Sequence, residues 1–274
     1  MSQSEYLADD LPPSIDPNKP SAARAYDYFL GGASNFAPDR EFAQQVLAIA
    51  PTIPAVARLN RGFLRRAVQY YLAQGIRQFL DLGSGIPTVG NTHQVAEAAG
   101  IKARVVYVDN EPVAYHHAEH LLAGNDNATA IQTDMRDVDA VLHHPQTERL
   151  LDLDQPLGLL VVGVLLYLPD PEPAELLHAY RQHLAPGSLV AVSTMTEEHA
   201  GPDLRAEMGR LRAAYAQLGE PVYPRDHAEI SAWFDGLELV EPGLVTLPEW
   251  HNDDDPDELD DPARPLGYGA VAVV

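Results

Sequence analysis

Apolar and polar residues follow different patterns on the two sides of Gly75. Before this glycine, residues 22–30, 38–50 and 55–74 have the length and composition of helices. In the third segment the apolar positions recur at steps of three and four, which is typical of one buried helix face. After Gly75, short and almost wholly apolar runs alternate with helix-length segments. These runs predict strands at 77–83, 103–109, 128–134, 157–168 and 188–195.

This alternation of strands and helices predicts the fold class. Continuous apolar strands separated by helices are typical of a parallel sheet covered on both faces, with right-handed crossovers. We therefore expect a doubly wound, mostly parallel α/β sheet that is related to the Rossmann fold. The segments between the strands that suit helices lie near 91–100, 112–123, 137–150 and 172–184.

The last third of the chain departs from the alternation. Two helices, from 202 to about 218 and at 226–234, precede two short strands at 237–243 and 268–274. No long helix fits between these strands, so we expect an antiparallel pair that closes a seven-stranded sheet. Such an ending is more typical of class I methyltransferases than of nicotinamide-dependent enzymes.

The expected organisation of the chain has three parts. Residues 1–20 carry four prolines and few large apolar residues, which predicts an extended and partly disordered lead. Residues 21–75 are expected to form an N-terminal helical cap over a site on the main domain. Residues 76–274 are expected to form the cofactor-binding domain, and a 274-residue chain suits one α/β domain with such an appendage.

The amino-acid composition limits the kinds of binding partner and the cellular compartment that we expect. The chain has 18 basic and 40 acidic residues, a net charge of −22 that repels phosphate backbones and anionic lipid, so neither nucleic acid nor membrane is an expected partner. Cysteine is absent and the first residues lack a secretory-signal pattern, which favours a cytoplasmic protein. The acidic run NDDDPDELDD at 252–261 is expected to form a solvated, mobile loop.

Chemistry-bearing residues follow the predicted strands at the positions where each strand ends. The first strand ends in Asp81, Leu82, Gly83, Ser84 and Gly85, and glycines there permit a tight turn and close approach to a ligand. A glycine pair of this kind is weak evidence by itself. The ligand of such a sheet sits outside the carboxyl ends of the strands, so we expect this turn to contact a cofactor.

The second and third strands each end in an aspartate as well. Asp109, followed by Asn110, can accept hydrogen bonds from both hydroxyls of a ribose. Asp134 can accept from the amino group of adenine, and Met135 can pack on the ring. Each aspartate alone fits a turn or a helix cap equally well. Carboxylates at three successive strand ends together predict an adenosyl-binding site.

A nicotinamide cofactor is the alternative ligand of such a site. The dinucleotide fingerprint requires a third glycine where this chain has Thr88. The preceding Pro87 removes a backbone amide that a pyrophosphate would use. A cofactor without phosphate tolerates that proline, which makes a nicotinamide enzyme the less favoured interpretation.

At this point the chain resembles a known family. The stretches ARAYDYFLGGASNFAPDR, RLNRGFLRRAV, GIRQFLDLGSGIPTVGNTH, ARVVYVDNEPV, TDMRD and LPD…LAPGS resemble the actinobacterial S-adenosylmethionine-dependent methyltransferases of methyltransferase family 19, formerly a domain of unknown function. The resemblance runs from about Pro20 to Val274. It implies the class I fold and S-adenosylmethionine as cofactor, and it supplies no methyl acceptor.

One position departs from the family pattern. Where the family usually reads VLHFVPD, this chain reads VLLYLPD, so that Leu166 replaces a histidine near the transferred methyl group. The adjacent Tyr167 can supply a polar group there or pack in the core. The expected function is an active methyltransferase, and this loss is the best support for the alternative, a cofactor-binding regulator or partner protein that lacks turnover. No catalytic base is identified from the sequence.

The cap and the helix before the first strand offer further candidates. Tyr26, Tyr28 and Phe36 can lie against a sulfonium, because ring faces attract cations, or they can simply dock the cap. Gly31 and Gly32 permit close backbone approach. Asn35 can bond the methionine end of the cofactor. Arg61 can pair with its carboxylate.

The histidines carry weaker signals. His116 and His120 share a helix face, but a metal site needs a third ligand, so we expect a solvated face and no metal. His143 and His144 have the same interpretation. Asn91 fits a helix cap as well as a ligand contact, and His93 fits a buried or exposed histidine better than a base. The expected acceptor is a small natural product or metabolite, and a homodimer stays open.

Overall fold

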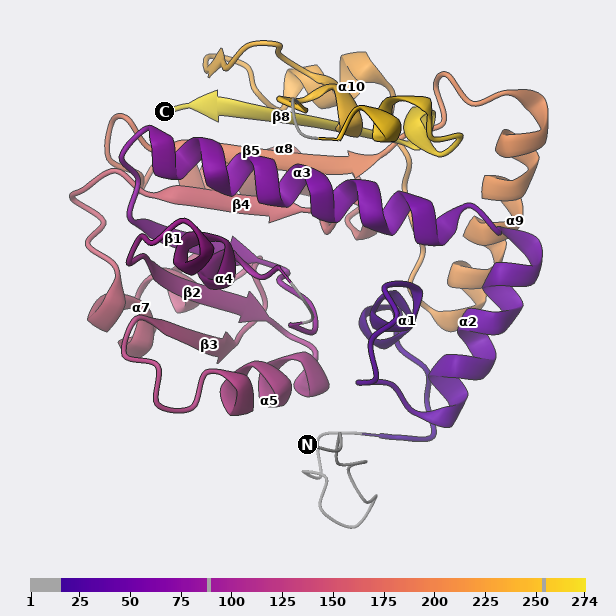
Figure 1. The fold of residues 1–274 in the computed structure, drawn as a ribbon, viewed down its shortest axis with the longest axis horizontal. Coiled ribbons are helices and arrows are strands. Elements are labelled where there is room, and N and C mark those ends of the chain that lie inside the picture. The colour runs from indigo at the N-terminus through magenta and orange to yellow at the C-terminus, as the bar shows by residue number, and fades with distance from the viewer. Residues whose placement is uncertain (1–15, 88–89, 253–254) are drawn as a thin grey trace.

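In the computed structural model, which describes residues 16–87, 90–252 and 255–274, one sheet contains eight strands (Figure 1). The strand order is β3-β2-β1-β4-β5-β8-β6, and β7 pairs with β8. The strands are β1 (Gln78–Leu82), β2 (Arg104–Asp109), β3 (Ala128–Gln132), β4 (Gly158–Val162), β5 (Leu189–Met195), β6 (Glu238–Leu239), β7 (Val245–Thr246) and β8 (Gly267–Val273).

The pairing confirms the doubly wound, mostly parallel sheet. Strands β1 to β5 are parallel to one another, whereas β8 runs antiparallel to β5, β6 and β7. The expected antiparallel pair, β6 and β8, is present, and the two-residue β7 adds an eighth strand to the expected seven. The order reverses between β1 and β4, and the carboxyl ends of β1 to β5 meet at one edge. Ligands of doubly wound sheets bind outside that edge.

Helices cover both faces of the sheet. Successive strand residues point to opposite sides, and the apolar residues on each side are buried against helices. Phe79 of β1 packs with one buried cluster and Leu80 with the other. The first face carries α3 (Ile53–Ala73), α4 (Thr92–Ala98) and α5 (Pro112–Leu121). The second face carries α6 (Val138–Leu142), α7 (Pro145–Leu150), α8 (Glu172–Arg181) and α10 (His227–Ala232).

Three further helices lie beyond the carboxyl edge, at the right of Figure 1. They are α1 (Ala22–Phe29), α2 (Ala37–Ile49) and α9 (Pro202–Leu218). Phe42 of α2 and Tyr215 of α9 meet edge to face with ring centroids 5.4 Å apart. In contrast, α3 runs along the sheet, where the ring of Tyr71 stacks on Phe79. The chain before β1 therefore contributes both to the sheet layers and to the edge where a ligand would bind.

The fourth strand is shorter than its apolar run predicts. It ends at Val162 rather than continuing to residue 168, and Leu165–Tyr167 form a 3-10 turn. Gly163 causes the break because its φ of +71° is left-handed. A Cβ at Gly163 would also lie 2.6 Å from Nδ2 of Asn60, so the helix α3 approaches this turn closely.

Two other expectations need correction. The helix predicted at 137–150 is two helices, because Pro145 opens α7 after α6 has ended. The acidic run is anchored rather than wholly solvated: 256–260 form a 3-10 turn, and the Glu258 carboxylate bonds the buried guanidinium of Arg66 at 2.8 Å. Its residues 253–254, like residues 1–15 of the expected lead, lie outside the described residues. Among the described helices, none has the length and hydropathy of a membrane span.

The packing of Gly158 against α3 generates a stability prediction. A Cβ at this position of β4 would overlap the ring of Tyr71. We expect Gly158→Ala to lower the free energy of unfolding by about 1–3 kcal/mol, as overpacked cores do. Gly209→Ala in α9 is the matched control, because a Cβ there meets nothing within 4 Å. This variant should raise the free energy of unfolding by up to about 1 kcal/mol, since alanine favours the helix more than glycine does. Urea denaturation measures both, and equal stability of the two variants would contradict the packing argument.

Candidate functional site

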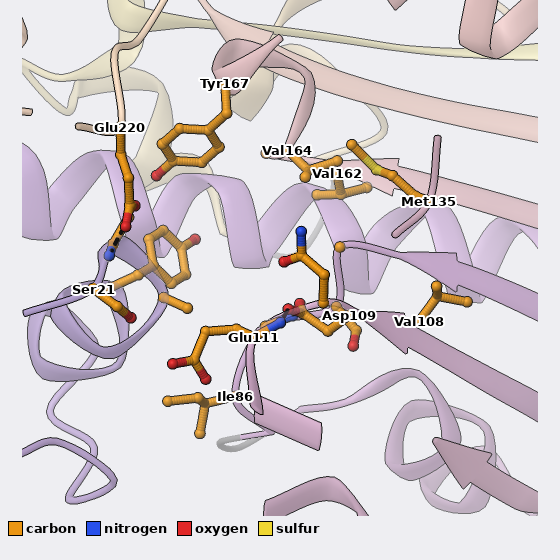
Figure 2. Close-up of a pocket in the computed structure, with 18 of the residues that line it drawn as sticks. Ser21, Ile86, Val108, Asp109, Glu111, Met135, Val162, Val164, Tyr167 and Glu220 are labelled. Atoms are coloured by element: carbon orange, nitrogen blue, oxygen red, sulfur yellow. Dashed lines mark hydrogen bonds between the residues drawn. The ribbon is translucent and has the colours of Figure 1, made fainter. Parts of the chain in front are cut away.

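A cavity of about 540 Å³ opens at the carboxyl edge of the sheet, where the strand order reverses (Figure 2). Small-molecule sites typically have volumes of roughly 300–1,000 Å³. Arg61 of α3 lines the cavity, as do residues of α1 and the segment after α9. Leu82 is buried in the core, whereas all the strand-end candidates for cofactor binding line the cavity: Asp81, Gly83, Ser84, Gly85, Asp109, Asn110, Asp134 and Met135.

The turn after β1 depends on the absence of a side chain at Gly83. Its φ is +63°, and a Cβ would overlap the side chain of Val164. The Gly83 amide donates to the carbonyl of Val108 at 2.8 Å, which fixes the turn against β2. The ends of β1, β2 and β4 therefore come close together around the cavity.

The Asp109 carboxylate is held by two backbone amides. Gly85 N–H donates to Oδ2 at 2.7 Å and Glu111 N–H donates to Oδ1 at 2.9 Å. Each oxygen keeps a further lone pair for a ligand. Burial raises the pKa of Asp109 to about 6, and the two amide bonds partly offset that rise.

Asp81 and Arg61 occupy the neighbouring part of the cavity. Asp81 accepts from the Thr92 hydroxyl at 2.8 Å, and burial raises its pKa to about 6. The guanidinium of Arg61 lies 3.2 Å from Oδ1 of Asn91, which is the N-cap residue of α4. An acid and a guanidinium thus face the same space from β1 and α3.

The third strand end combines a held carboxylate with an apolar wall. Arg136 donates to Asp134 at 2.6 Å through Nη2, and this hydrogen bonding holds the pKa of Asp134 below its usual value. Met135 shares the wall with Val108, Val162 and Val164 (Figure 2). This wall suits a flat apolar group such as a base.

Of the candidates in the cap region, Tyr26 lines the cavity, whereas Tyr28, Gly32 and Asn35 do not. Gly32 and Asn35 instead surround Asp27, which does line it. Asn35 Nδ2 donates to Asp27 Oδ2 at 2.8 Å, and a Cβ at Gly32 would overlap the Asp27 carboxylate. Burial raises the pKa of Asp27. Tyr28 lies away from this group, with its hydroxyl 3.5 Å from Gln44 Nε2.

Histidines weighed from the sequence lie outside the cavity. His93 is buried, with its ring nitrogen 2.6 Å from the hydroxyl of Tyr107, and burial lowers the pKa of His93. His116 lies on α5 with its ring nitrogen 3.5 Å from the carboxylate of Glu119. Neither of these two histidines is among the residues that line the space beside Asp109.

Sequence reasoning missed Glu111 and Glu220, which join α1 to the start of α5 and to the segment after α9. Arg24 of α1 donates to Glu111 at 2.6 Å and to Asp39 at 2.8 Å. Glu220 accepts from the Ala22 amide at 3.0 Å, and burial raises the pKa of Glu220. Glu111 stands two residues after Asp109, a signal that the sequence offered. Glu220 gives no local signal, because its partner is almost 200 residues away.

The fold defines the class: a class I, Rossmann-like methyltransferase fold with a large cavity at the switch point of the sheet. The sequence profile of the family described as S-adenosyl methyltransferase matches residues 8–274, and the chain belongs to this family. The resemblance found in the sequence is confirmed, and membership implies S-adenosylmethionine as the cofactor.

Two solved structures are similar over nearly the whole chain. A DUF574 family protein from Streptomyces avermitilis has 35% identity and a TM-score of 0.87, with 94% of this chain and 98% of that chain covered. A candidate methyltransferase from Thermobifida fusca has 37% identity and a TM-score of 0.86, with 96% and 97% covered. No curated protein matches the sequence.

The raised pKa values predict how stability depends on pH. Asp81 and Asp109 bind protons more tightly when folded than when unfolded, so their contribution to the free energy of unfolding should fall as pH rises from about 4 to 6. Between these pH values, the decrease in the free energy of unfolding should be about 1–3 kcal/mol smaller in Asp109→Asn than in Asp154→Asn, whose replaced side chain is exposed. Urea denaturation without cofactor measures the slopes, and identical slopes in both variants would refute the raised pKa of Asp109.

Proposed function

We propose that this protein is an S-adenosylmethionine-dependent methyltransferase acting on a small-molecule acceptor, and that the cavity at the carboxyl edge binds the cofactor. One observation carries the proposal. Asp109 ends β2 with its carboxylate held by Gly85 and Glu111, beside the turn at Gly83. A carboxylate so fixed can accept from two vicinal hydroxyls of a ribose.

The lining of the cavity fits this cofactor in its charges. S-adenosylmethionine carries a sulfonium and an ammonium, one carboxylate and no phosphate. Two guanidiniums, Arg61 and Arg136, line the cavity. More numerous are its carboxyl groups: Asp27, Asp81, Asp109, Glu111, Asp134 and Glu220. Such an excess of acids favours a cationic ligand and disfavours the pyrophosphate of a nicotinamide cofactor.

Each part of the cofactor has residues that would hold it. Asp109 would accept hydrogen bonds from the ribose hydroxyls. Asn110 and Met135 would flank the adenine, and Asp134 would accept a hydrogen bond from the adenine amino group. Asp81 and Arg61 would pair with the ammonium and the carboxylate of the methionine end. Gly32 and Asn35 would act through Asp27 rather than by direct contact.

When bound, the cofactor supplies an electrophilic methyl group on a positively charged sulfur that departs neutral. The chain mainly has to orient the acceptor and exclude water. Helix α1, which Arg24 joins to Glu111, contributes Ala22, Tyr26 and Asp27 to the wall of the cavity. Leu166, which stands where the family has a histidine, does not line this cavity, whereas Tyr167 does. We favour turnover over a purely regulatory role because the sulfur leaves neutral, so that a base is needed only for an acceptor that loses a proton during attack.

Calorimetric titration tests the role of Asp109. We expect Asp109→Ala to weaken S-adenosylhomocysteine binding by roughly 2–4 kcal/mol, because two charge-assisted hydrogen bonds disappear. Asp154→Ala is the control, since this exposed acid lies before β4 at the opposite edge. An unchanged affinity in Asp109→Ala would refute the ribose role.

Two assays test the function as a whole. The wild-type protein should bind S-adenosylhomocysteine and show no heat of binding with NAD or NADP. Labelled methyl groups from S-adenosylmethionine should then appear in a product when a metabolite extract is supplied. Cofactor binding without any labelled product would support the regulator instead, and nicotinamide binding would overturn the cofactor assignment.

A further inference from the structure

The proposed cofactor contacts use only part of the cavity at the carboxyl edge. They come from the ends of β1, β2 and β3 and from Arg61 of α3. Much of the remaining wall comes from residues within 21–30, Glu111, Tyr167 and residues 219–221, and we call this part the α1 side of the cavity. An acceptor has to touch the methyl group while the cofactor is bound. It must therefore occupy the α1 side of the same cavity.

The α1 side carries negative charge. Its described lining residues include three acids, Asp27, Glu111 and Glu220, and neither a lysine, an arginine nor a histidine. Two cations, Lys19 and Arg24, act on Glu220 without lining the cavity. Of these, Lys19 is exposed and Arg24 is already paired with Glu111. This part of the cavity therefore favours a cationic acceptor and disfavours an anionic one.

Two of the three acids are occupied by other parts of the chain. Glu111 accepts from Arg24 through Oε1 at 2.6 Å and from the Ala114 amide through Oε2 at 2.8 Å. Asp27 accepts from Asn35 through Oδ2 at 2.8 Å, and its Oδ1 is buried. Glu220 is left as the acid whose carboxylate can bind an acceptor directly.

Glu220 has one oriented and one open carboxylate oxygen. Its Oε2 accepts from the Ala22 amide at 3.0 Å, whereas its Oε1 is accessible and has no hydrogen-bond partner among the described residues. The backbone bond fixes the carboxylate and leaves the lone pairs of Oε1 for a ligand. Burial raises the pKa of Glu220, which makes its carboxylate a better proton acceptor than an exposed one.

The Tyr167 hydroxyl is a second open group on the α1 side. It is accessible and makes no hydrogen bond with any described residue. Figure 2 shows this side chain directed toward Glu220. Burial raises the pKa of Tyr167, and Tyr215 and Glu220 raise it further, so the phenol stays protonated near neutral pH. A carboxylate oxygen and a phenol that face the same space can together hold one nitrogen.

We propose that the methyl acceptor is a small amine that binds as a cation, with its nitrogen bonded to Oε1 of Glu220 and to the hydroxyl of Tyr167. This inference rests on the proposed function, because it assigns the cofactor to the rest of the cavity. It makes Glu220 an acceptor-binding residue and excludes acceptors that carry a carboxylate or a phosphate at the reacting end.

Glu220 also serves the proton balance of the transfer. An ammonium has no lone pair, so it first gives one proton to the Glu220 carboxylate. The nitrogen lone pair then forms the bond to the methyl carbon, and the electron pair of the carbon–sulfur bond goes to the sulfur, which becomes neutral. The methylated amine leaves as an ammonium, and the proton on Glu220 passes to water.

Calorimetric titration with three probes tests the recognition. Benzylamine, benzyl alcohol and benzoate share one ring and differ in charge, and saturating S-adenosylhomocysteine keeps them out of the cofactor contacts. Near neutral pH, benzylamine should bind the complex with S-adenosylhomocysteine roughly tenfold more tightly than benzyl alcohol, because it forms a charge-assisted hydrogen bond. Benzoate should show no heat of binding.

Two variants test the named groups. Glu220→Gln should weaken benzylamine binding roughly tenfold and leave benzyl alcohol and S-adenosylhomocysteine binding unchanged, since the amide keeps the bond to Ala22 but not the charge. Tyr167→Phe should weaken benzylamine binding roughly threefold. Glu238→Gln is the matched control, because Glu238 is exposed on β6 and does not line the cavity. It should bind all probes as the wild type does.

The labelled product from a metabolite extract gives a second readout. With a carbon-13 methyl group in S-adenosylmethionine, the product should show the chemical shift of a methyl group on nitrogen. A methyl group on oxygen or carbon would overturn the inference and leave the methyltransferase function intact.

The binding outcomes separate the two proposals. If S-adenosylhomocysteine binds but benzylamine shows no heat, or binds no more tightly than benzyl alcohol or benzoate, the amine acceptor is refuted and the cofactor assignment stands. Equal benzylamine affinity in Glu220→Gln and Glu238→Gln would also refute it. If S-adenosylhomocysteine does not bind the wild-type protein, or no labelled product forms, the proposed function itself fails, whatever benzylamine does.

Discussion

The arrangement of the site depends on the two hydrogen bonds that the Asp109 carboxylate accepts from backbone amides. The carboxylate bonds the amide of Gly85 after β1 and the amide of Glu111 before α5, so one side chain joins two strand ends and a helix start. Because the two backbone amides are uncharged donors, they hold the carboxylate in place without neutralising it, and its negative charge stays available for a ligand. The same bonds fix Glu111, and through Glu111 the guanidinium of Arg24. The position of α1 is thereby coupled to the geometry of the cavity at the carboxyl edge.

Most of the sheet could be predicted because its determinants are local. Buried parallel strands are apolar on both faces, and the acids that follow them stand out against that background. Where the prediction was wrong, a tertiary contact or a single residue decided the structure. The apolar run after residue 157 continues past Gly163, yet the strand ends there because Gly163 adopts a left-handed φ of +71°. Glu258 belongs to a run that resembles solvated loop, and only the distant Arg66 explains why it is anchored.

The site shows the same division between local and tertiary information. Strand-end residues such as Asp109 and Met135 line the cavity, because the carboxyl ends of parallel strands share one edge by topology. In the cap, composition indicated a functional segment but not the direction of its side chains. Gly32 and Asn35 turn toward Asp27, and Asp27 reaches the cavity in their place. Direction within a short helix and its following loop depends on how α1 docks, which no local pattern encodes.

A second cavity of about 90 Å³ lies beside the acidic one, and Tyr26, Asn60, Gly163 and Tyr167 line both. The acids of the first cavity favour a cationic ligand, whereas none of the residues that line the second cavity is an acid, a lysine, an arginine or a histidine. Asn60 stands at the boundary, and its amide is committed to Ser193 on one side and Tyr26 on the other. It can therefore hold the wall between the cavities without adding charge to either. Gly163 beneath it has no side chain, so the wall there is as thin as a backbone allows. The acidic cavity and the apolar one are therefore separated by residues that carry no charge: Tyr26, Asn60, Gly163 and Tyr167.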